Sequence, residues 1–516
     1  MGKRRWYVLG GVALALVAAG AAVAYWTPLG VPLMSGAPVA WQPRPVAAEY
    51  NRAVADLIDQ GQPPEGREPG AVNGYPLLIQ AAGRYRREFT NVQQVAVEAL
   101  FQQEILPHRD FPPEAELRAI GRESLARARQ IGLLALLDQA VTAPRLARAM
   151  DGTPERAAQM ADLQIEPARV DELSLTSFGT LPEAPAFRAL IRLAYTRMTV
   201  AAGTVPWIGP PTEPDPAEFI AGVRMALGVS RALLHQESID NHVRGQSLTR
   251  GSARMIMECL RFVNDDATLA AVAAAAEEHS RRSPTFLFSL STEPAVSRVL
   301  ADRLFTKWGR PDAGAWQQYH QLTSESDSFD ASRKNLRWGT WGLSRAEFLE
   351  YSDALTAMIA AWWKTLPEDR GSTEAWERFA NMKDRHVHLS VMRLGVTSLR
   401  LVVQIADEAA LHLVALTTAV AVERYRIATG NYPADLSVVV GKGLLPAVPR
   451  DAIARAPLGY RRLDTPDAQG RPYLLYSIGA DGVDDGAQRL SEDFGSERQS
   501  ALFGPAPTPT VDVLLN

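Results

Sequence analysis

The stretch "LHLVALTTAVAVERYRIATGNYP", residues 411–433, decides how the C-terminal part of the chain folds. Its first half, residues 411–422, is almost entirely apolar, with acidic residues on both sides. This run is too short to span a bilayer, and a buried helix of about 30 residues beginning near Arg393 fits the pattern better. Gly430 is a suitable helix stop, so the sequence predicts a long core helix followed by a different kind of structure.

The chain upstream of this helix, from about residue 76, shows mainly the hydrophobic period of α-helices. In residues 214–234, Asp215 can cap the first turn of a helix. One face of that helix then carries Phe219, Val223, Ala226, Leu233 and Leu234. In residues 343–363, Ser344 and Glu347 form a capping box. The sequence therefore predicts a mainly α fold with a large helical body.

The N-terminus predicts a membrane anchor. "MGKRR" is followed by residues 6–26, which carry no charge and have aromatic residues at both ends. As a helix, this segment has a length of roughly 30 Å, which matches a bilayer core. The basic cluster favours a single-pass helix in the inner (cytoplasmic) membrane, with the N-terminus inside and the bulk of the chain extracytoplasmic. The alternative is a signal peptide cleaved near Ala24.

Composition excludes some classes of function. Hydrophobic residues make up 47% of the chain and charged residues 22%, as in a globular protein with a real core. The formal net charge is −4, which argues against a nucleic-acid partner. The lone cysteine, Cys259, rules out an intramolecular disulfide and Cys-rich zinc sites, and its apolar neighbours predict a buried side chain.

A cluster of aspartates follows a predicted β-hairpin made of residues 459–464 and 471–479. In "YSIGADGVDDG", residues 476–486, three carboxylates lie within five residues, spaced by glycines: Asp481, Asp484 and Asp485. Like charges this close repel unless a cation joins them, and calcium prefers oxygen ligands from such short loops. The sequence predicts a calcium site here, and a solvated acidic turn without metal is the alternative.

The order of "ERYRIATGNYP", "LLPAVPRD" and "YLLYSIGADG" resembles the C-terminal half of the major pseudopilin of type II secretion systems, over residues 410–487. The resemblance implies a small α+β domain whose last loop binds calcium, with Asp481 at the position of the family's aspartate. Pseudopilins carry a glutamate early in their apolar helix, and residues 6–26 have none, which argues against assembly as a pilus subunit. The overall layout is similar to large membrane-anchored bacterial proteins of planctomycete type.

Other motifs in the helical body are weaker. "HQESIDNH" places His235 and His242 seven residues apart, on one face of a predicted helix, but the four-residue zinc-protease spacing is absent, so surface or capping roles are favoured over metal binding. Tryptophans gather in residues 308–376, where a platform for glycan is one interpretation and core packing the favoured one. No nucleophile elbow, phosphate loop or dinucleotide fingerprint occurs.

These patterns divide the chain into five parts. They are an anchor (1–27), a Pro-rich spacer with a first helix (28–75), a helical body (76–392), a long helix with a pseudopilin-like α+β domain (393–487), and a loose tail (488–516). The favoured function is non-enzymatic: a structural or interaction protein with a calcium-stabilised C-terminal module, linked to secretion or the envelope and to other envelope proteins. The alternative is an extracytoplasmic hydrolase of glycan type, with its site in the helical body.

Overall fold

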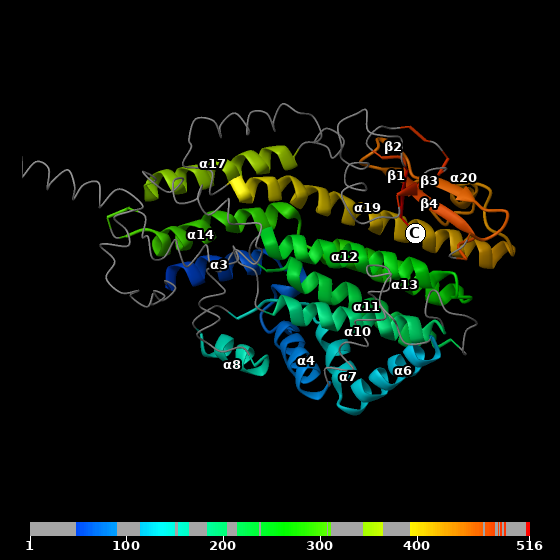
Figure 1. Cartoon of the computed structure of the whole chain (residues 1–516), viewed down its shortest axis with the longest axis horizontal. Coiled ribbons are helices and arrows are strands. Elements are labelled where there is room, and N and C mark those ends of the chain that lie inside the picture. Colours follow the sequence, from blue (N-terminus) through cyan, green and yellow to red (C-terminus); the bar gives the residue numbers. More distant parts are fainter. Residues whose placement is uncertain are drawn as a thin grey trace, which may run out of the picture.

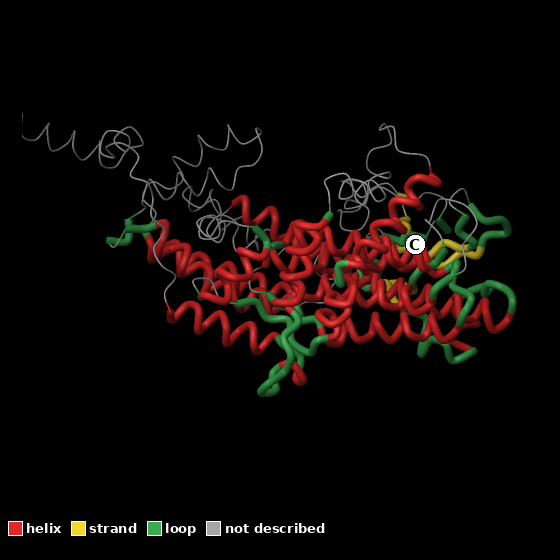
Figure 2. The backbone as a smooth tube through the Cα atoms, turned by 90° about the horizontal axis from the view of Figure 1, so that it is seen from below, coloured by secondary structure: helices red, strands yellow, loops and turns green. Residues whose placement is uncertain are grey.

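The structure is a computed structural model, and most of the described chain in it is helical. Helices pack side by side into an elongated body, and a group of short strands lies at one end (Figures 1 and 2). This confirms the predicted mainly α class, whereas the predicted anchor lies outside the described residues. The structure describes residues 48–89, 114–149, 153–164, 183–203, 214–236, 239–306, 308–310, 344–364, 393–467, 470–479, 483–484, 486–487, 490–491 and 512–515.

The body is built around α11, which contacts α7, α10, α12 and α13. Most of α11 is buried, and Gly228 lies so close to α7 that an added Cβ would be 2.4 Å from the Cβ of Val141. The helices of the body are α4 (Tyr75–Glu88), α6 (Glu114–Gln130), α7 (Leu133–Thr142), α8 (Pro154–Asp162), α10 (Ala184–Ala201), α11 (Pro216–Leu234), α12 (Ile239–Leu260) and α13 (Asp266–Arg282).

Local sequence signals fix where two helices begin. The side chain of Asp215 accepts a hydrogen bond from the amide of Glu218 at 3.1 Å, so it caps α11 as predicted. The capping box is also confirmed: the Ser344 amide donates to Glu347 at 2.8 Å, and the Glu347 amide donates to Ser344 at 3.2 Å. The predicted apolar face of α11 is buried, namely Phe219, Val223, Ala226, Leu233 and Leu234.

Three helices form an arm beside this body: α3 (Ala48–Gly61), α14 (Phe286–Leu304) and α17 (Arg345–Trp363). In Figure 1, the arm lies toward the end opposite the strands. α14 packs against both α3 and α17. Val54 and Ile58 of α3 form a small buried cluster with Ala147, next to Ala295 of α14. A short 3-10 helix, η1 (Pro64–Gly66), follows α3 and leads the chain back to the body.

The long helix α19 (Arg393–Thr429) begins at the predicted residue and contacts α12 and α13. Within the described chain, its segment Ile405–Thr429 is the one helix long and apolar enough to cross a membrane by length and composition. However, 67% of the most apolar window in that segment is buried inside the protein. The prediction of a buried core helix is therefore confirmed.

The C-terminal module follows α19 with one short helix, α20 (Leu436–Gly441), and two small sheets. The predicted hairpin is confirmed: β3 and β4 pair antiparallel, with Gly459 opposite Tyr476 and Arg462 opposite Tyr473. The strands are β1 (Arg450–Asp451), β2 (Ala456–Pro457), β3 (Gly459–Arg462), β4 (Tyr473–Ser477), β5 (Leu490–Ser491) and β6 (Asp512–Leu514).

The tail contradicts the prediction of a loose segment wherever it is described. β6 pairs antiparallel with β4, and β5 pairs parallel with β6, so the larger sheet has the order β3-β4-β6-β5. Val513 and Leu515 are buried. The physical reason is that β4 has a second edge with unpaired backbone groups, and the apolar end of the chain pairs with that edge.

Candidate functional site

The loop after β4 begins with the sharp turn that the glycines predicted. Gly479 and Gly486 both have positive φ angles, of 75° and 66°. Between them, the exposed Asp484 accepts hydrogen bonds through Oδ1 from the Tyr476 hydroxyl at 3.0 Å and from the Gly486 amide at 2.8 Å. Arg461 donates to the Gly486 carbonyl at 2.5 Å. The loop is thus tied to β3 and β4, and Asp484 accepts both of these hydrogen bonds through Oδ1.

The other two predicted calcium ligands, Asp481 and Asp485, lie outside the described residues. Within the part of the chain that the structure describes, no three His, Cys, Asp or Glu side chains gather as a metal site. Asp484 is therefore the one predicted ligand whose placement is known, and the three carboxylates stay a prediction as a set.

Asp451 is a buried carboxylate in the same module that the sequence did not single out. Its Oδ1 accepts from the amides of Ile453 and Ala454 at 2.9 and 3.1 Å, closing a tight turn after β1. Burial raises the pKa of Asp451, while the nearby Ser477 hydroxyl and the two amides lower it. Its Oδ2 is buried and makes no hydrogen bond of good geometry to the described residues. The only signal in the sequence was an aspartate before a turn, which is too common to mark a buried site.

Glu423 forms the joint between α19 and the C-terminal module. This carboxylate is fully buried and accepts from Nε of Arg426 at 2.7 Å and from the Tyr432 hydroxyl at 3.3 Å. Tyr473 of β4 adds a further hydrogen bond. Burial raises the pKa of Glu423, and the bonds and charge of Arg426 offset that rise only in part. One carboxylate thus joins the helix, the loop after it and the sheet.

Aromatic rings surround this joint. The ring centroids of Tyr432 and Tyr473 are 5.4 Å apart, and those of Tyr460 and Tyr473 are 5.7 Å apart. The Tyr460 hydroxyl donates to the carbonyl of Pro433 at 2.9 Å. Arg426 also reaches the body, where its Nη2 donates to the backbone carbonyl of Val263 at 3.1 Å. Glu423 and Arg426 thus connect the body, the long helix and the module through hydrogen bonds, which is a structural role.

Comparison of the chain with protein-family models, with curated proteins and with solved structures gives no match.

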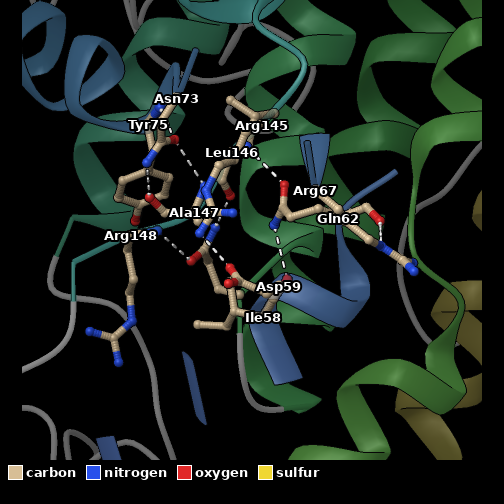
Figure 3. A network of polar contacts seen from close by, with 11 residues as sticks. Ile58, Asp59, Gln62, Arg67, Asn73, Tyr75, Arg145, Leu146, Ala147 and Arg148 are labelled. Carbon is tan, nitrogen blue, oxygen red and sulfur yellow. Dashed lines mark hydrogen bonds and ion pairs between the residues drawn. The ribbon is translucent and has the colours of Figure 1, made fainter. Parts of the chain in front are cut away.

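A second polar network fixes the N-terminal part of the body (Figure 3). Asn73 donates to the Ala147 carbonyl at 2.7 Å and accepts from the Ala147 amide at 3.1 Å. Gln62 accepts from the Leu146 amide at 2.9 Å and donates to the Ile58 carbonyl at 3.2 Å. The sticks in Figure 3 show the side chains of Gln62 and Asn73 facing the backbone of Leu146 and Ala147. They form hydrogen bonds with these backbone groups in place of a neighbouring strand.

A buried ion pair lies beside this network. Arg156 of α8 makes a two-pronged contact with Glu183, at 2.7 and 3.0 Å, and the Tyr75 hydroxyl donates to the same carboxylate at 2.5 Å. All three side chains are buried. Burial tends to raise the pKa of Glu183, but the charge and hydrogen bonds of Arg156 prevail and hold it below its usual value. The three groups satisfy one another.

The structure corrects the prediction for the two histidines of "HQESIDNH". They do not share a helix: His235 is the C-cap of α11, and His242 lies in the first turn of α12. The capping role is thus confirmed for His235, but both side chains are buried and do not lie at the surface. Of the tryptophan-rich segment, Trp363 is described and its ring lies 4.6 Å from that of Phe286, whereas Trp308 is 77% exposed. Most of that segment lies outside the described residues.

Proposed function

We propose that this chain is an extracytoplasmic structural or interaction protein, held at the cytoplasmic membrane by residues 6–26. Its pseudopilin-like C-terminal module is stabilised by calcium and presented to other envelope proteins, in a role linked to secretion or the envelope. The protein acts through the fixed position of its surfaces and not through chemistry on a substrate.

The observation that carries this proposal is the continuity of the hydrophobic core. One cluster of buried residues runs from Tyr75 through α10 to α13, along α19, and on to Val513 and Leu515 of the module. α19 has 37 residues, and a straight helix of that size is about 55 Å long. A module that shares its core with the body has a set orientation, which favours a display or scaffolding role over a flexible tether.

Calcium fits the chemistry of the loop after β4. Hydrogen bonds hold Oδ1 of Asp484, and Asp481 and Asp485 supply further carboxylates within the same loop. Calcium takes six to eight oxygen ligands, which carboxylates, backbone carbonyls and water can supply together. A bound cation would remove the repulsion among these carboxylates and stabilise the edge of the sheet where the tail pairs.

Calcium is expected to raise the thermal midpoint of the full-length protein. At a hundredfold excess over its dissociation constant, the gain in the free energy of unfolding is about 2.7 kcal/mol. The measurement is differential scanning calorimetry of the detergent-solubilised protein with calcium or with a chelator. The full chain is needed because α19 buries its apolar surface in the body.

Three variants serve as the comparison for that experiment. Asp481→Ala and Asp484→Ala should each abolish the calcium shift. Asp464→Ala removes an exposed acidic residue from the turn of the β3–β4 hairpin and should keep the shift. An unchanged shift in Asp481→Ala, or no shift in the unaltered protein, contradicts the proposed site.

A further inference from the structure

The arm and the body meet along a contact that we call the seam: α11, α12 and α13 on one side, α3 and α14 on the other. The large hydrophobic core does not include the buried residues of α3 and α14. Val54 and Ile58 of α3 instead form a small cluster of their own with Ala147. The apolar packing of the arm is therefore separate from the core of the body.

Buried imidazoles lie at the seam. His235 lies at the end of α11, close to the backbone of Gly61 in α3 and of Arg282, and its buried Nδ1 makes no hydrogen bond of good geometry to the described residues. His242 lies at the start of α12 and contacts Ser289 of α14 through Nδ1 at 3.0 Å. His279 lies in the last turn of α13. All three are at most 3% exposed.

The hydrogen bonds of His242 assign its proton. Nε2 lies 3.1 Å from Nε2 of Gln246, which can only donate, so the histidine Nε2 accepts and carries no proton. Nδ1 then carries the proton and donates to Ser289. A second proton, placed on Nε2, would point at the N–H group of Gln246, and the hydrogen bond between these two nitrogens would be lost. The ring is fully buried and packs edge-on against Phe286 at 5.5 Å, so solvent does not reach it to replace the lost bond.

Burial, and after it the charge of Arg231, lowers the pKa of His235 and makes a second proton there unfavourable, and the backbone groups of Arg282 and Gly61 offset this only in part. Arg231 of its own helix and His279 of α13 are the titratable groups whose charge disfavours protonation of His235. Arg282 and Arg281 of α13 lie close to Arg231, and the opposing carboxylates are Glu278 of α13 and Glu65 of η1. Glu65 is already bound to Arg282 at 2.8 Å. For His242, burial alone disfavours the charge.

His279 is held on the body side of the seam. Its Nε2 lies 3.2 Å from the Thr249 hydroxyl of α12 and 3.5 Å from the Ser283 hydroxyl. Thr249 gives its own proton to the carbonyl of Gly245, so it accepts from His279. The charge of Arg231 faces this ring as well. Burial, and after it this charge, lowers the pKa of His279 to about 3, so the ring stays neutral over most of the range in which the latch acts.

We infer that the seam is an acid-sensitive latch: protons taken up by His235 and His242 release α3 and α14 from the body, while the core around α11 and α19 stays packed. This device goes beyond the proposed function. It concerns the first described helix after the predicted anchor, so release changes how the body is connected to the membrane. The extracytoplasmic location exposes the latch to the pH of the surroundings.

The direction of the pH effect follows from the protonation of each state. Burial lowers the pKa of His235 and of His242 from 6.5 to about 3. The closed seam then excludes protons that an opened seam binds, so closure is fully stable above pH 6.5 and weakens as the pH falls from 6.5 toward 3. Each histidine shifts the opening equilibrium about tenfold per pH unit in that range.

Hydrogen exchange of the full-length protein, read by mass spectrometry peptide by peptide, tests this latch. After correction for the intrinsic exchange rate, lowering the pH from 7.5 to 5.5 should raise the opening constant of α3 and of the start of α14 about a hundredfold. Peptides of α10 and α11 should show no such rise. An equal rise across the whole chain, or none in the arm, overturns the proposal.

Variants separate the latch from general acid unfolding. His235→Gln with His242→Gln should remove the rise, and His242→Gln alone should reduce it to about tenfold, which keeps the test decisive if the double variant does not fold. His412→Gln, in α19 and away from the seam, should leave the rise unchanged. A hundredfold rise that persists in the glutamine variants overturns the role of these imidazoles.

Discussion

Replacing Glu183 with alanine is expected to lower the free energy of unfolding by about 3–5 kcal/mol. The change leaves the guanidinium of Arg156 buried without its partner, and it removes the acceptor of the Tyr75 hydroxyl. A buried charge without a counter-ion costs far more than the pair itself contributes, because water cannot reach it. Chemical denaturation of the purified full-length protein measures the loss.

Two comparisons make that result specific. Asp302→Ala breaks the exposed pair with Arg345, whose side chains are 58% and 37% accessible, and should cost about 1 kcal/mol or less. Replacing both partners of the buried pair, Glu183→Leu with Arg156→Met, should cost less than Glu183→Ala alone because no charge is left behind. Equal losses in Glu183→Ala and Asp302→Ala would contradict the burial of the pair.

Glu423→Ala is expected to cost about 2–3 kcal/mol and to loosen the C-terminal module from the body. The carboxylate accepts from Arg426 and Tyr432, and both lose this acceptor in the variant. The loss should be smaller than for Glu183 because Arg426 is partly exposed and can regain water. Thermal unfolding followed by near-ultraviolet circular dichroism reports the tyrosines around the joint.

Glu423→Gln provides the matched test of charge. Because burial raises the pKa of Glu423, the folded state disfavours its charged form, and the neutral amide keeps an oxygen for the tyrosine hydroxyls. This variant should therefore cost less than Glu423→Ala. Arg424→Ala, next in sequence and bound to the half-exposed Asp266, should cost about 1 kcal/mol or less. A loss as large as that of Glu423→Ala would mean that any change near the end of α19 has the same effect.

The features that the sequence predicted correctly are those with short-range causes. The cap of α11 by Asp215 and the capping box of Ser344 and Glu347 involve residues three apart. The long helix that begins at Arg393 and the β3–β4 hairpin follow from one period each. Cys259 was predicted to be buried from its apolar neighbours alone, and it is.

The features that the sequence missed depend on partners far away in the chain. Tyr75 and Glu183 are 108 residues apart, and His242 meets Ser289 across 47 residues. No local pattern distinguishes a surface histidine from one enclosed by another helix. The tail was expected to be loose because its composition is polar until the last residues, yet Val513 completes the sheet beside β4.

Of the candidate calcium site, the sequence predicted the residues and the structure places one of them. Asp484 lies in the loop after β4, turned by Gly479 and Gly486 as the spacing of glycines indicated. Asp451 and Glu423 were missed because a single acidic residue at a turn or a helix end is ordinarily solvated. Asp451 and Glu423 are buried because the module packs on α19, and no local pattern in the sequence predicts that packing.

The shared core of body and module can be tested by proteolysis across a series of urea concentrations, with the cleaved peptides identified by mass spectrometry. Cleavage within residues 430–479 of the module and within α11 to α13 of the body should begin at the same urea concentration, because one hydrophobic cluster joins them. Cleavage of the module at clearly lower urea, with the body still protected, would show an independent domain and contradict the proposed rigid unit.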